Sequence, residues 1–410
     1  MRRSILLTVA ASATLALAAC SSGNGTTGGD DAAETDGGSP ATGATLTIWT
    51  DETREGPVRA AAESFTEATG TQVEVVQKNY DDIRPDFLAQ VPTGEGPDIT
   101  VGAHDWLGEL TTNGVVQPIE LGDKADGFEP VSIQAFTQDG QVYGLPYAIE
   151  NIALIRNTDL APEAPATWDD AVAAGQAAGT RYPILVQTGN EGDPYTYYPL
   201  QTSFGAPVFA QNEDGSYEPE LTLGGEPGHA FARWLAAQGS AGVLSPDVTA
   251  DIARDAFANG ESPFIVGGPW LLEDYAGMNL AIDPIPAPGP ETAKPFVGVQ
   301  GFYVSAQSKN ALVANDFLVN YLSTEEAQTA LFEAGGRPPA LTAAAEKAAS
   351  DPIVEGFQAV GADALPMPSI PQMGSVWAFW GVTEAAIITG QTDPVAGWDK
   401  MVADIQGAIG

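Results

Sequence analysis

Residues 44–102 alternate between two hydrophobic periodicities, and this alternation constrains the fold more than any other feature of the chain. The runs "ATLTIWT" (44–50), "TQVEVV" (71–76) and "PDITVG" (97–102) are short, apolar and rich in β-branched residues, which predicts strands. Helical patterns separate these runs. Strand–helix–strand units of this kind are typical of α/β layers with parallel pairing, so we expect an α/β fold.

The segment between the first two runs, "GPVRAAAESFTEATG" (56–70), carries clear helix signals. Pro57 suits a first helical turn and Gly70 suits a stop. Apolar residues recur at helical spacing between them. We expect them to share one face of the helix: Val58, Ala61, Phe65 and Ala68.

The same alternation recurs in the second half of the chain. Short apolar runs predict three more strands, at 182–187, 261–268 and 280–285. Helical patterns with aromatic faces occur at 231–239 and 312–323, and the chain reads as helical from about 376 to its end. We therefore expect two α/β lobes with several chain crossings between them.

The start of the chain predicts export and a lipid anchor. Residues 1–19 have a basic start, an apolar stretch and small residues before Cys20, which is the layout of a signal peptide. Leu17-Ala18-Ala19-Cys20 resembles the lipobox of bacterial lipoproteins, which implies a diacylglyceryl group on the Cys20 sulfur. An ordinary signal peptide with a chance cysteine is the alternative. Cys20 is the only cysteine of the chain, and a secreted protein with one free thiol is otherwise unusual.

Residues 20–43 contain the lipidated cysteine and then almost only Gly, Ser, Thr and Asp. Such a segment cannot bury enough apolar surface to fold, so we expect a flexible tether. The roughly 365 residues that follow are enough for two ordinary domains. The formal net charge of −38 repels nucleic acid and argues against a DNA or RNA partner.

Catalytic and metal-binding patterns are weak throughout. The chain has two histidines, His104 and His229, and lacks HExxH, CxxC and GxSxG motifs, so we expect no metal and no cofactor. The glycine-rich "GGEPG" is not followed by the Lys-Ser or Lys-Thr of a phosphate loop. A glycosidase-type carboxylate pair stays open, because 54 acidic residues make such pairs uninformative.

Aromatic residues give the stronger signal. Several of the eight tryptophans and eleven tyrosines lie near polar or turn residues, outside helical core spacing: Trp106 after "AHD", Tyr195 in "GDPYTYY", Trp270 in "GGPW" at the end of a predicted strand, and Trp377 after "IPQMGSV". Sugars bind through flat rings against their C–H faces and through charged groups on their hydroxyls. Core packing of each ring is the alternative. Together the rings predict a carbohydrate site.

An ordered set of short strings spans nearly all of 44–405: "LTIWTDE", "TGEGPDI", "AHDWLGEL", "YGLPYAIEN", "DPYTYYPL", "VGGPW", "KPFVGVQGF" and "PMPSIPQMGSVW". This set resembles the maltose/maltodextrin-binding proteins of bacterial ABC importers, within the family 1 extracellular solute-binding proteins. The resemblance implies a two-lobe periplasmic-binding-protein-like clamp with multiple hinge crossings and without catalysis. It implies lobe 1 at 44–148 plus 302–345, and lobe 2 at 149–301 plus 346–410.

The resemblance also implies ligand-binding residues. Its polar positions match Asp51, Arg54, Asp105, Glu150 and Asp193, and its stacking rings match Tyr195, Trp270 and Trp377. The chain departs from the pattern at three places. Trp106 stands where an arginine is usual, Gly102 where a tryptophan is usual, and Gly381 near a position often held by arginine. Trp106 is therefore either a relocated stacking ring or a group that blocks a subsite.

The preferred hypothesis is a monomeric, lipid-anchored receptor at the extracellular face of the cell membrane. It captures maltose or maltodextrin and presents it to an ABC permease. One rival is the same clamp for another neutral sugar, such as trehalose, a cyclodextrin or another oligosaccharide. A second rival is an extracellular glycoside-acting enzyme, and a third is a structural or adhesive surface lipoprotein.

Overall fold

The computed structural model describes residues 45–212 and 216–410. The predicted signal peptide, Cys20 and the tether lie outside the described residues. The first predicted unit is confirmed: β1 (Thr45–Thr50), α1 (Glu55–Thr69) and β2 (Gln72–Gln77) follow one another, and the two strands pair in parallel.

Helix α1 buries the face that the spacing predicts, with one exception. Val58, Ala61 and Phe65 are buried, and Gly70 ends the helix at φ 79°. Ala68 is exposed, and Ala62 is buried in its place. At about 100° per residue, Ala62 lies about 40° from Val58 around the helix axis, whereas Ala68 lies about 80° away, at the edge of the face.

The first sheet has seven strands. Its order is β14-β13-β3-β1-β2, and β4 and β7 also pair with β13. β1 pairs in parallel with β2 and β3, whereas β13 is antiparallel to β3, β4 and β7. The remaining strands of this sheet are β3 (Ile99–Ala103), β4 (Val116–Gln117), β7 (Gly144–Asn151), β13 (Phe296–Ser305) and β14 (Leu365–Pro366).

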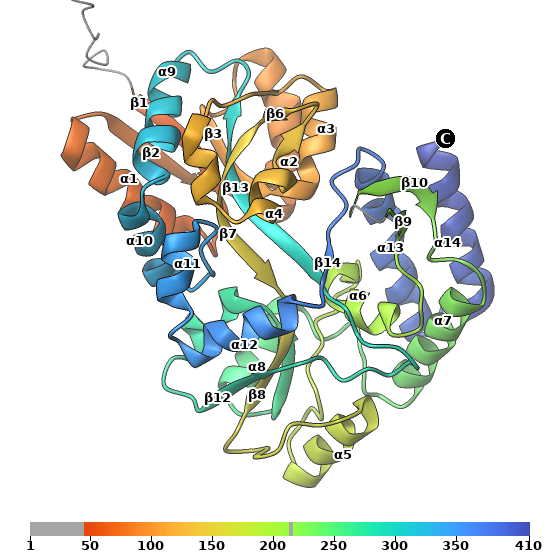
Figure 1. Cartoon of the computed structure of the whole chain (residues 1–410). Coiled ribbons are helices and arrows are strands. Elements are labelled where there is room, and N and C mark those ends of the chain that lie inside the picture. Colours follow the sequence, from red (N-terminus) through yellow and green to blue (C-terminus); the bar gives the residue numbers. More distant parts are fainter. Residues whose placement is uncertain (1–44, 213–215) are drawn as a thin grey trace, which may run out of the picture. The chain divides into compact units, whose positions relative to one another are not determined.

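Helical segments far along the chain pack beside α1 (Figure 1). They are α9 (Ala311–Asn315), a π-helical turn (Asp316–Leu322), α10 (Glu325–Gly335) and α11 (Thr342–Ala348). Phe65 of α1 packs edge-on against Phe317, with ring centroids 4.9 Å apart. The helical prediction for 312–323 is therefore confirmed, although its second half is π-helical.

The second sheet has three antiparallel strands in the order β11-β8-β12. They are β8 (Ala153–Asn157), β11 (Phe264–Gly267) and β12 (Leu280–Asp283). The strand predicted at 182–187 is wrong, because that segment makes only a single bridge between Leu185 and Ile265. Pro183 lacks the backbone N–H that a longer ladder would need.

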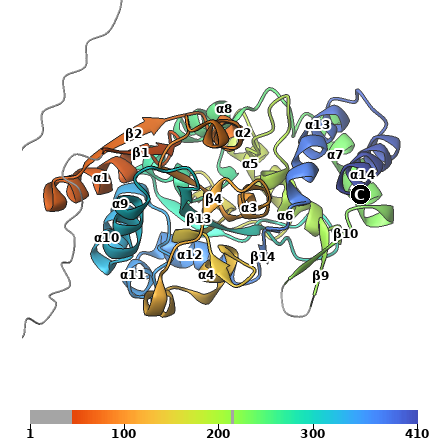
Figure 2. The ribbon, with the colours of Figure 1, turned by 90° about the horizontal axis from the view of Figure 1, so that it is seen from above.

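Further helices follow β8 along the chain: α5 (Trp168–Ala178), α6 (Pro194–Thr202), α7 (Gly225–Ser240), α8 (Ala250–Ala258), α12 (Pro352–Gly361), α13 (Met373–Ile388) and α14 (Pro394–Ile409). Figures 1 and 2 both show α7, α13 and α14 grouped together. Buried tryptophans fill this group, and the indole N–H of Trp398 donates to the Leu223 carbonyl at 2.7 Å. The helical prediction for the last 35 residues is thus confirmed, with a break at 389–393.

The short elements complete the description. They are α2 (Tyr80–Gln90), α3 (Leu107–Thr112), α4 (Pro130–Ala135) and the hairpins β5–β6 (Thr137–Gln138, Gln141–Val142) and β9–β10 (Phe209–Gln211, Tyr217–Leu221). No helix within 45–212 or 216–410 has the length and hydropathy that a membrane crossing requires.

The chain passes between the two sheets more than once. β7 ends at Asn151 in the first sheet, and β8 starts at Ala153 in the second. β12 of the second sheet leads back to β13 of the first, and α11 leads to α12, which packs on β12. Several crossings therefore connect the two halves, while the residues at which the lobes divide stay a prediction.

Candidate ligand-binding site

A cavity of about 620 Å³ collects side chains from many parts of the chain. Its size is typical of small-molecule sites. Residues from the ends of β1 and β3, from β7 and β13, and from α2, α6, α8 and α13 line it. All nine predicted ligand-binding residues are among them: Asp51, Arg54, Asp105, Trp106, Glu150, Asp193, Tyr195, Trp270 and Trp377. The structure therefore brings the whole predicted set together.

One side of the cavity begins at the turn that leaves β1. Asp51 Oδ1 accepts hydrogen bonds from the Thr53 amide (2.9 Å) and the Thr53 hydroxyl (2.7 Å), and its other oxygen pairs with Arg54. Arg54 Nε also donates to the Tyr147 hydroxyl at 3.1 Å. Burial by itself would raise the pKa of Asp51, but Arg54 and Thr53 outweigh it and hold that pKa below its usual value.

Glu150 on β7 joins the same group. Arg337 Nε donates to Glu150 Oε2 at 3.0 Å, and the Gln300 side-chain amide donates to Glu150 Oε1 at 2.7 Å. Arg54 lies 3.8 Å from Glu150 Oε1. Two arginines and two carboxylates thus form a buried network with balanced formal charge, which we call the charged wall: Asp51, Arg54, Glu150 and Arg337.

Asp105 lies in the short 3₁₀ turn that follows β3. Its carboxylate accepts from the Trp377 indole N–H at 3.3 Å. Burial raises the pKa of Asp105. The neighbouring His104 bonds to backbone at both ring nitrogens: Nδ1 accepts from the Val299 amide at 3.1 Å, and Nε2 lies 2.9 Å from the Met367 carbonyl. His104 is therefore a neutral residue that fastens the end of β3, and burial lowers its pKa.

Trp106 occupies the space above Gly102. A Cβ atom on Gly102 would lie 2.1 Å from the Trp106 ring, so only glycine fits beneath that ring. Trp106 also packs against Tyr80, with ring centroids 5.7 Å apart, and is only 4% exposed. Trp106 therefore lines the cavity while protein covers most of its ring.

Asp193 caps α6 as well as lining the cavity. Its Oδ1 accepts from the Thr196 amide at 3.1 Å, and its Oδ2 accepts from the Thr196 hydroxyl at 2.8 Å and from the Gln187 side chain. Burial raises the pKa of Asp193. Most of its lone pairs are thus used inside the protein, and the cap explains why an aspartate suits this position.

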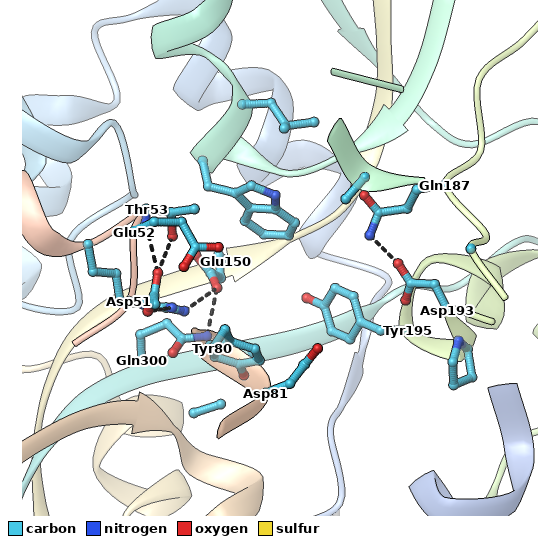
Figure 3. Close-up of a pocket in the computed structure, with 18 of the residues that line it drawn as sticks. Asp51, Glu52, Thr53, Tyr80, Asp81, Glu150, Gln187, Asp193, Tyr195 and Gln300 are labelled. Atoms are coloured by element: carbon cyan, nitrogen blue, oxygen red, sulfur yellow. Dashed lines mark hydrogen bonds and ion pairs between the residues drawn. The ribbon is translucent and has the colours of Figure 1, made fainter. Parts of the chain in front are cut away.

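Three half-buried rings also line the cavity: Tyr195, Trp270 and Trp377. We call them the aromatic wall. Tyr195 lies 6.3 Å from Trp270 and 6.1 Å from buried Phe296, and Phe296 lies 6.4 Å from Trp377 (centroid distances). Figure 3 shows Tyr195 opposite Glu150, with Gln187 and Asp193 on its own side of the cavity.

Several lining residues were missed from the sequence: Tyr80, Arg84, Arg254, Gln300 and Arg337. Four of the ten arginines of this acidic chain line one cavity, which no local pattern indicates. Arg337 had the clearest signal, in "GGRPP", because glycines stop a helix and prolines confine the segment that follows to a loop or to the edge of a sheet.

Within 45–212 and 216–410, no group of three His, Cys, Asp or Glu side chains is placed to hold a metal ion. His229 does not line the cavity and pairs with Asp399 at 2.6 Å.

Residues 60–356 match a family model described as a bacterial extracellular solute-binding protein. A galactooligosaccharide-binding protein of Bacillus subtilis is 27% identical over 390 residues, covering 90% of each chain. A maltodextrin-binding protein of the same organism is 27% identical over 350 residues, covering 81% of this chain and 82% of the relative.

A maltotriose binding protein of Thermus thermophilus, solved with maltotriose, superposes with a TM-score of 0.81 at 33% identity, covering 89% of this chain and 100% of that one. This match confirms the predicted α/β clamp and the predicted resemblance. Because the family model covers well over half of the sequence and the fold agrees, the chain belongs to the bacterial extracellular solute-binding proteins.

Proposed function

We propose that the protein is the substrate-binding component of an ABC sugar importer. It holds a neutral oligosaccharide in the cavity, and maltose or a short maltodextrin is the first candidate. One observation carries the proposal: half-buried rings and a buried network of arginines and carboxylates face the same cavity of about 620 Å³. The names of the similar proteins support a sugar ligand.

The two walls suit the two kinds of surface on a sugar. The aromatic wall covers C–H faces, and the charged wall exchanges hydrogen bonds with hydroxyl groups. Asp51, Glu150 and the arginines already satisfy one another, so a neutral hydroxyl fits them without requiring an added charge. A few such contacts, each worth about 1–3 kcal/mol, are sufficient for micromolar binding at about −8 kcal/mol.

Closure of the two lobes would complete the site. Asp105 follows β3 of the first sheet, and Trp377 lies on α13; their hydrogen bond of 3.3 Å therefore joins two distant parts of the chain that both line the cavity. A clamp that is open when empty spends part of its contact energy on closing, so its apparent affinity falls with the closed fraction. We expect sugar to stabilise the closed form.

The anchor and the partners are also part of the proposal. Lipidation of Cys20 would hold a monomeric receptor at the outer face of the cell membrane, where it delivers sugar to the permease. The replacement Cys20→Ser should release the protein into the medium, as measured by fractionation of cells and culture fluid. Unchanged membrane association of that variant would contradict the anchor.

A calorimetric sugar panel on the purified protein tests the ligand. We expect binding of maltose, maltotriose or a longer maltodextrin. A response to galacto-oligosaccharide, trehalose or cyclodextrin alone would keep the clamp and change the sugar. Incubation with maltodextrin tests the enzyme alternative, because shortened products would show hydrolysis. The absence of binding to every sugar would refute the carbohydrate proposal.

A further inference from the structure

Arg337 stands opposite Glu150 because of a short extra pairing on the edge of β7. Helix α10 ends at Gly335, and its C-cap residue Gly336, with a φ of 68°, turns the chain toward that edge. Ala148 and Pro339 form an antiparallel bridge, and backbone bonds link Ile149 to Pro338 (2.9 Å) and Ala340 to Tyr147 (3.0 Å). Extending this register by two residues pairs Arg337 with Glu150, and directly opposite residues share one face of a sheet.

The N–H groups of the Arg337 guanidinium donate hydrogen bonds to two residues, Glu150 and Thr53. Nε donates to Glu150 Oε2 at 3.0 Å. Nη1 donates to the Thr53 carbonyl at 3.0 Å, and Nη2 donates to the Thr53 hydroxyl at 2.7 Å. That hydroxyl in turn donates to Asp51 Oδ1 at 2.7 Å. Arg337 is therefore bonded to one of the two carboxylates of the charged wall and reaches the other through Thr53.

Burial limits what Arg337 can touch. Its side chain is 3% exposed, as is that of Glu150, and three of its N–H groups are already engaged. Arg337 is therefore held against Glu150 and Thr53. A lysine would keep the charge but could not reproduce the planar fork.

We propose that Arg337 is a positioning residue for ligand binding, which orients Glu150 directly and Asp51 through Thr53. It thereby determines which oxygen lone pairs of both carboxylates face the ligand. The inference rests on the proposed sugar-binding function, because it assigns a role toward the same site.

Calorimetry with maltotriose on the purified full chain gives the first test. Arg337→Gln should weaken binding more than about tenfold, and Arg337→Lys should recover part of the loss. Arg156 is a matched control, because it is a buried arginine paired with Asp283 at 2.6 Å and does not line the cavity. Arg156→Gln should lower the melting temperature but change the affinity by less than about threefold.

A double-mutant cycle separates positioning from direct contact. Because Arg337 acts partly through Glu150, Arg337→Gln should cost clearly less affinity in a Glu150→Gln background than in the unchanged protein, and the remaining loss belongs to the route through Thr53 to Asp51. Additive losses would overturn the inference, and so would an Arg337→Gln variant with the affinity of the unchanged protein. Should Arg337→Gln fail to fold, Arg337→Lys replaces it, and unchanged affinity of that variant overturns the inference equally.

A ligand-free crystal structure of Arg337→Gln distinguishes failure of this inference from failure of the proposed function. Displaced Glu150 and Thr53 side chains are expected, and side chains in their original positions would overturn the positioning role. If the unchanged protein binds no sugar of the panel, the proposed function fails and the binding role of Arg337 fails with it, whatever that structure shows.

Discussion

The two walls of the cavity differ in how their side chains are held. On the charged wall, Asp51, Arg54, Glu150 and Arg337 are buried and bonded to one another. On the aromatic wall, Tyr195, Trp270 and Trp377 are only half-buried and meet neighbouring rings at centroid distances of 5.5 to 6.4 Å. Folding thus removes water from the charged groups before any ligand binds, whereas part of the apolar surface of the aromatic wall stays available to a ligand.

This difference predicts different consequences of mutation. A buried ion pair that loses one partner leaves an uncompensated charge, so changes in the charged wall should affect folding and binding together. A half-buried ring contributes less to the core, so changes in the aromatic wall should affect binding more than folding. The four predictions below test this contrast, from the largest expected effect to the smallest.

Glu150→Ala should lower the free energy of unfolding by about 3–5 kcal/mol, because it leaves buried Arg337 and Arg54 without their shared carboxylate. This revises the expectation from the sequence, in which Glu150 is a ligand contact only. Denaturant unfolding measures the effect. Glu52→Ala is the control, since Glu52 lines the same cavity but is exposed, and should change the free energy by less than about 0.5 kcal/mol. Equal stability of the two variants would contradict the preorganised charged wall.

Gly102→Ala should cost about 1–3 kcal/mol of unfolding free energy, because its Cβ would lie 2.1 Å from the Trp106 ring. The displaced ring should enter the cavity and weaken sugar binding. Denaturant unfolding and calorimetry measure both effects. Gly56→Ala is the control, because its Cβ would meet nothing within 4 Å, and the alanine should leave α1 unchanged or slightly more stable. If Gly102→Ala behaves like this control, the fit of Trp106 is looser than the structure indicates.

Trp270→Ala should weaken sugar binding by more than about tenfold, or roughly 1.4 kcal/mol, with a smaller effect on unfolding than Glu150→Ala. The reason is that its half-buried ring offers surface to the ligand from the aromatic wall. Trp234→Ala is the control, because Trp234 is a half-buried ring of α7 that does not line the cavity. A large loss of stability with unchanged affinity would identify Trp270 as a core residue.

The smallest expected effect concerns His104, which connects the end of β3 to the backbone of Val299 and Met367. Burial lowers its pKa below 6.5, so the unfolded chain takes up a proton before the folded protein does. Stability from this group is complete above about pH 6.5 and falls as the pH drops toward the folded pKa, by at most about 1.4 kcal/mol per pH unit. Raised pKa values at Asp105 and Asp193 act in the opposite direction. The test therefore compares the pH dependence of unfolding with that of His104→Gln, and identical slopes would contradict a buried neutral His104.

Much of the local structure followed from sequence patterns. The spacing of Val58, Ala61 and Phe65 predicted α1, and Gly70 predicted its end, because both signals act within a few residues. The strand predicted at 182–187 is wrong. An apolar run can be buried without being a strand, and Pro183 lacks the backbone N–H that a longer ladder of hydrogen bonds needs. The nine site residues share one cavity; sequence context indicated the four rings, and only resemblance to a family indicated the five polar residues.

The partners of those residues could not be predicted from local patterns. Arg337 meets Glu150 across 187 positions, and Trp377 meets Asp105 across 272. Asp193 was expected at the ligand, and its role as the cap of α6 was overlooked, although its place before Pro194 is a recognisable helix start. Contacts at such separations depend on register and packing, which no short window of sequence contains.

The sequence by itself determined the α/β alternation, the limits of α1 and the residue types that a sugar site needs, because propensity, periodicity and side-chain chemistry are local properties. Only the tertiary structure decided that the charged groups of one wall neutralise one another while the rings of the other stay half-buried. The physical reason is that burial and electrostatic pairing arise when distant segments meet, and these two quantities determine which groups remain free for a ligand.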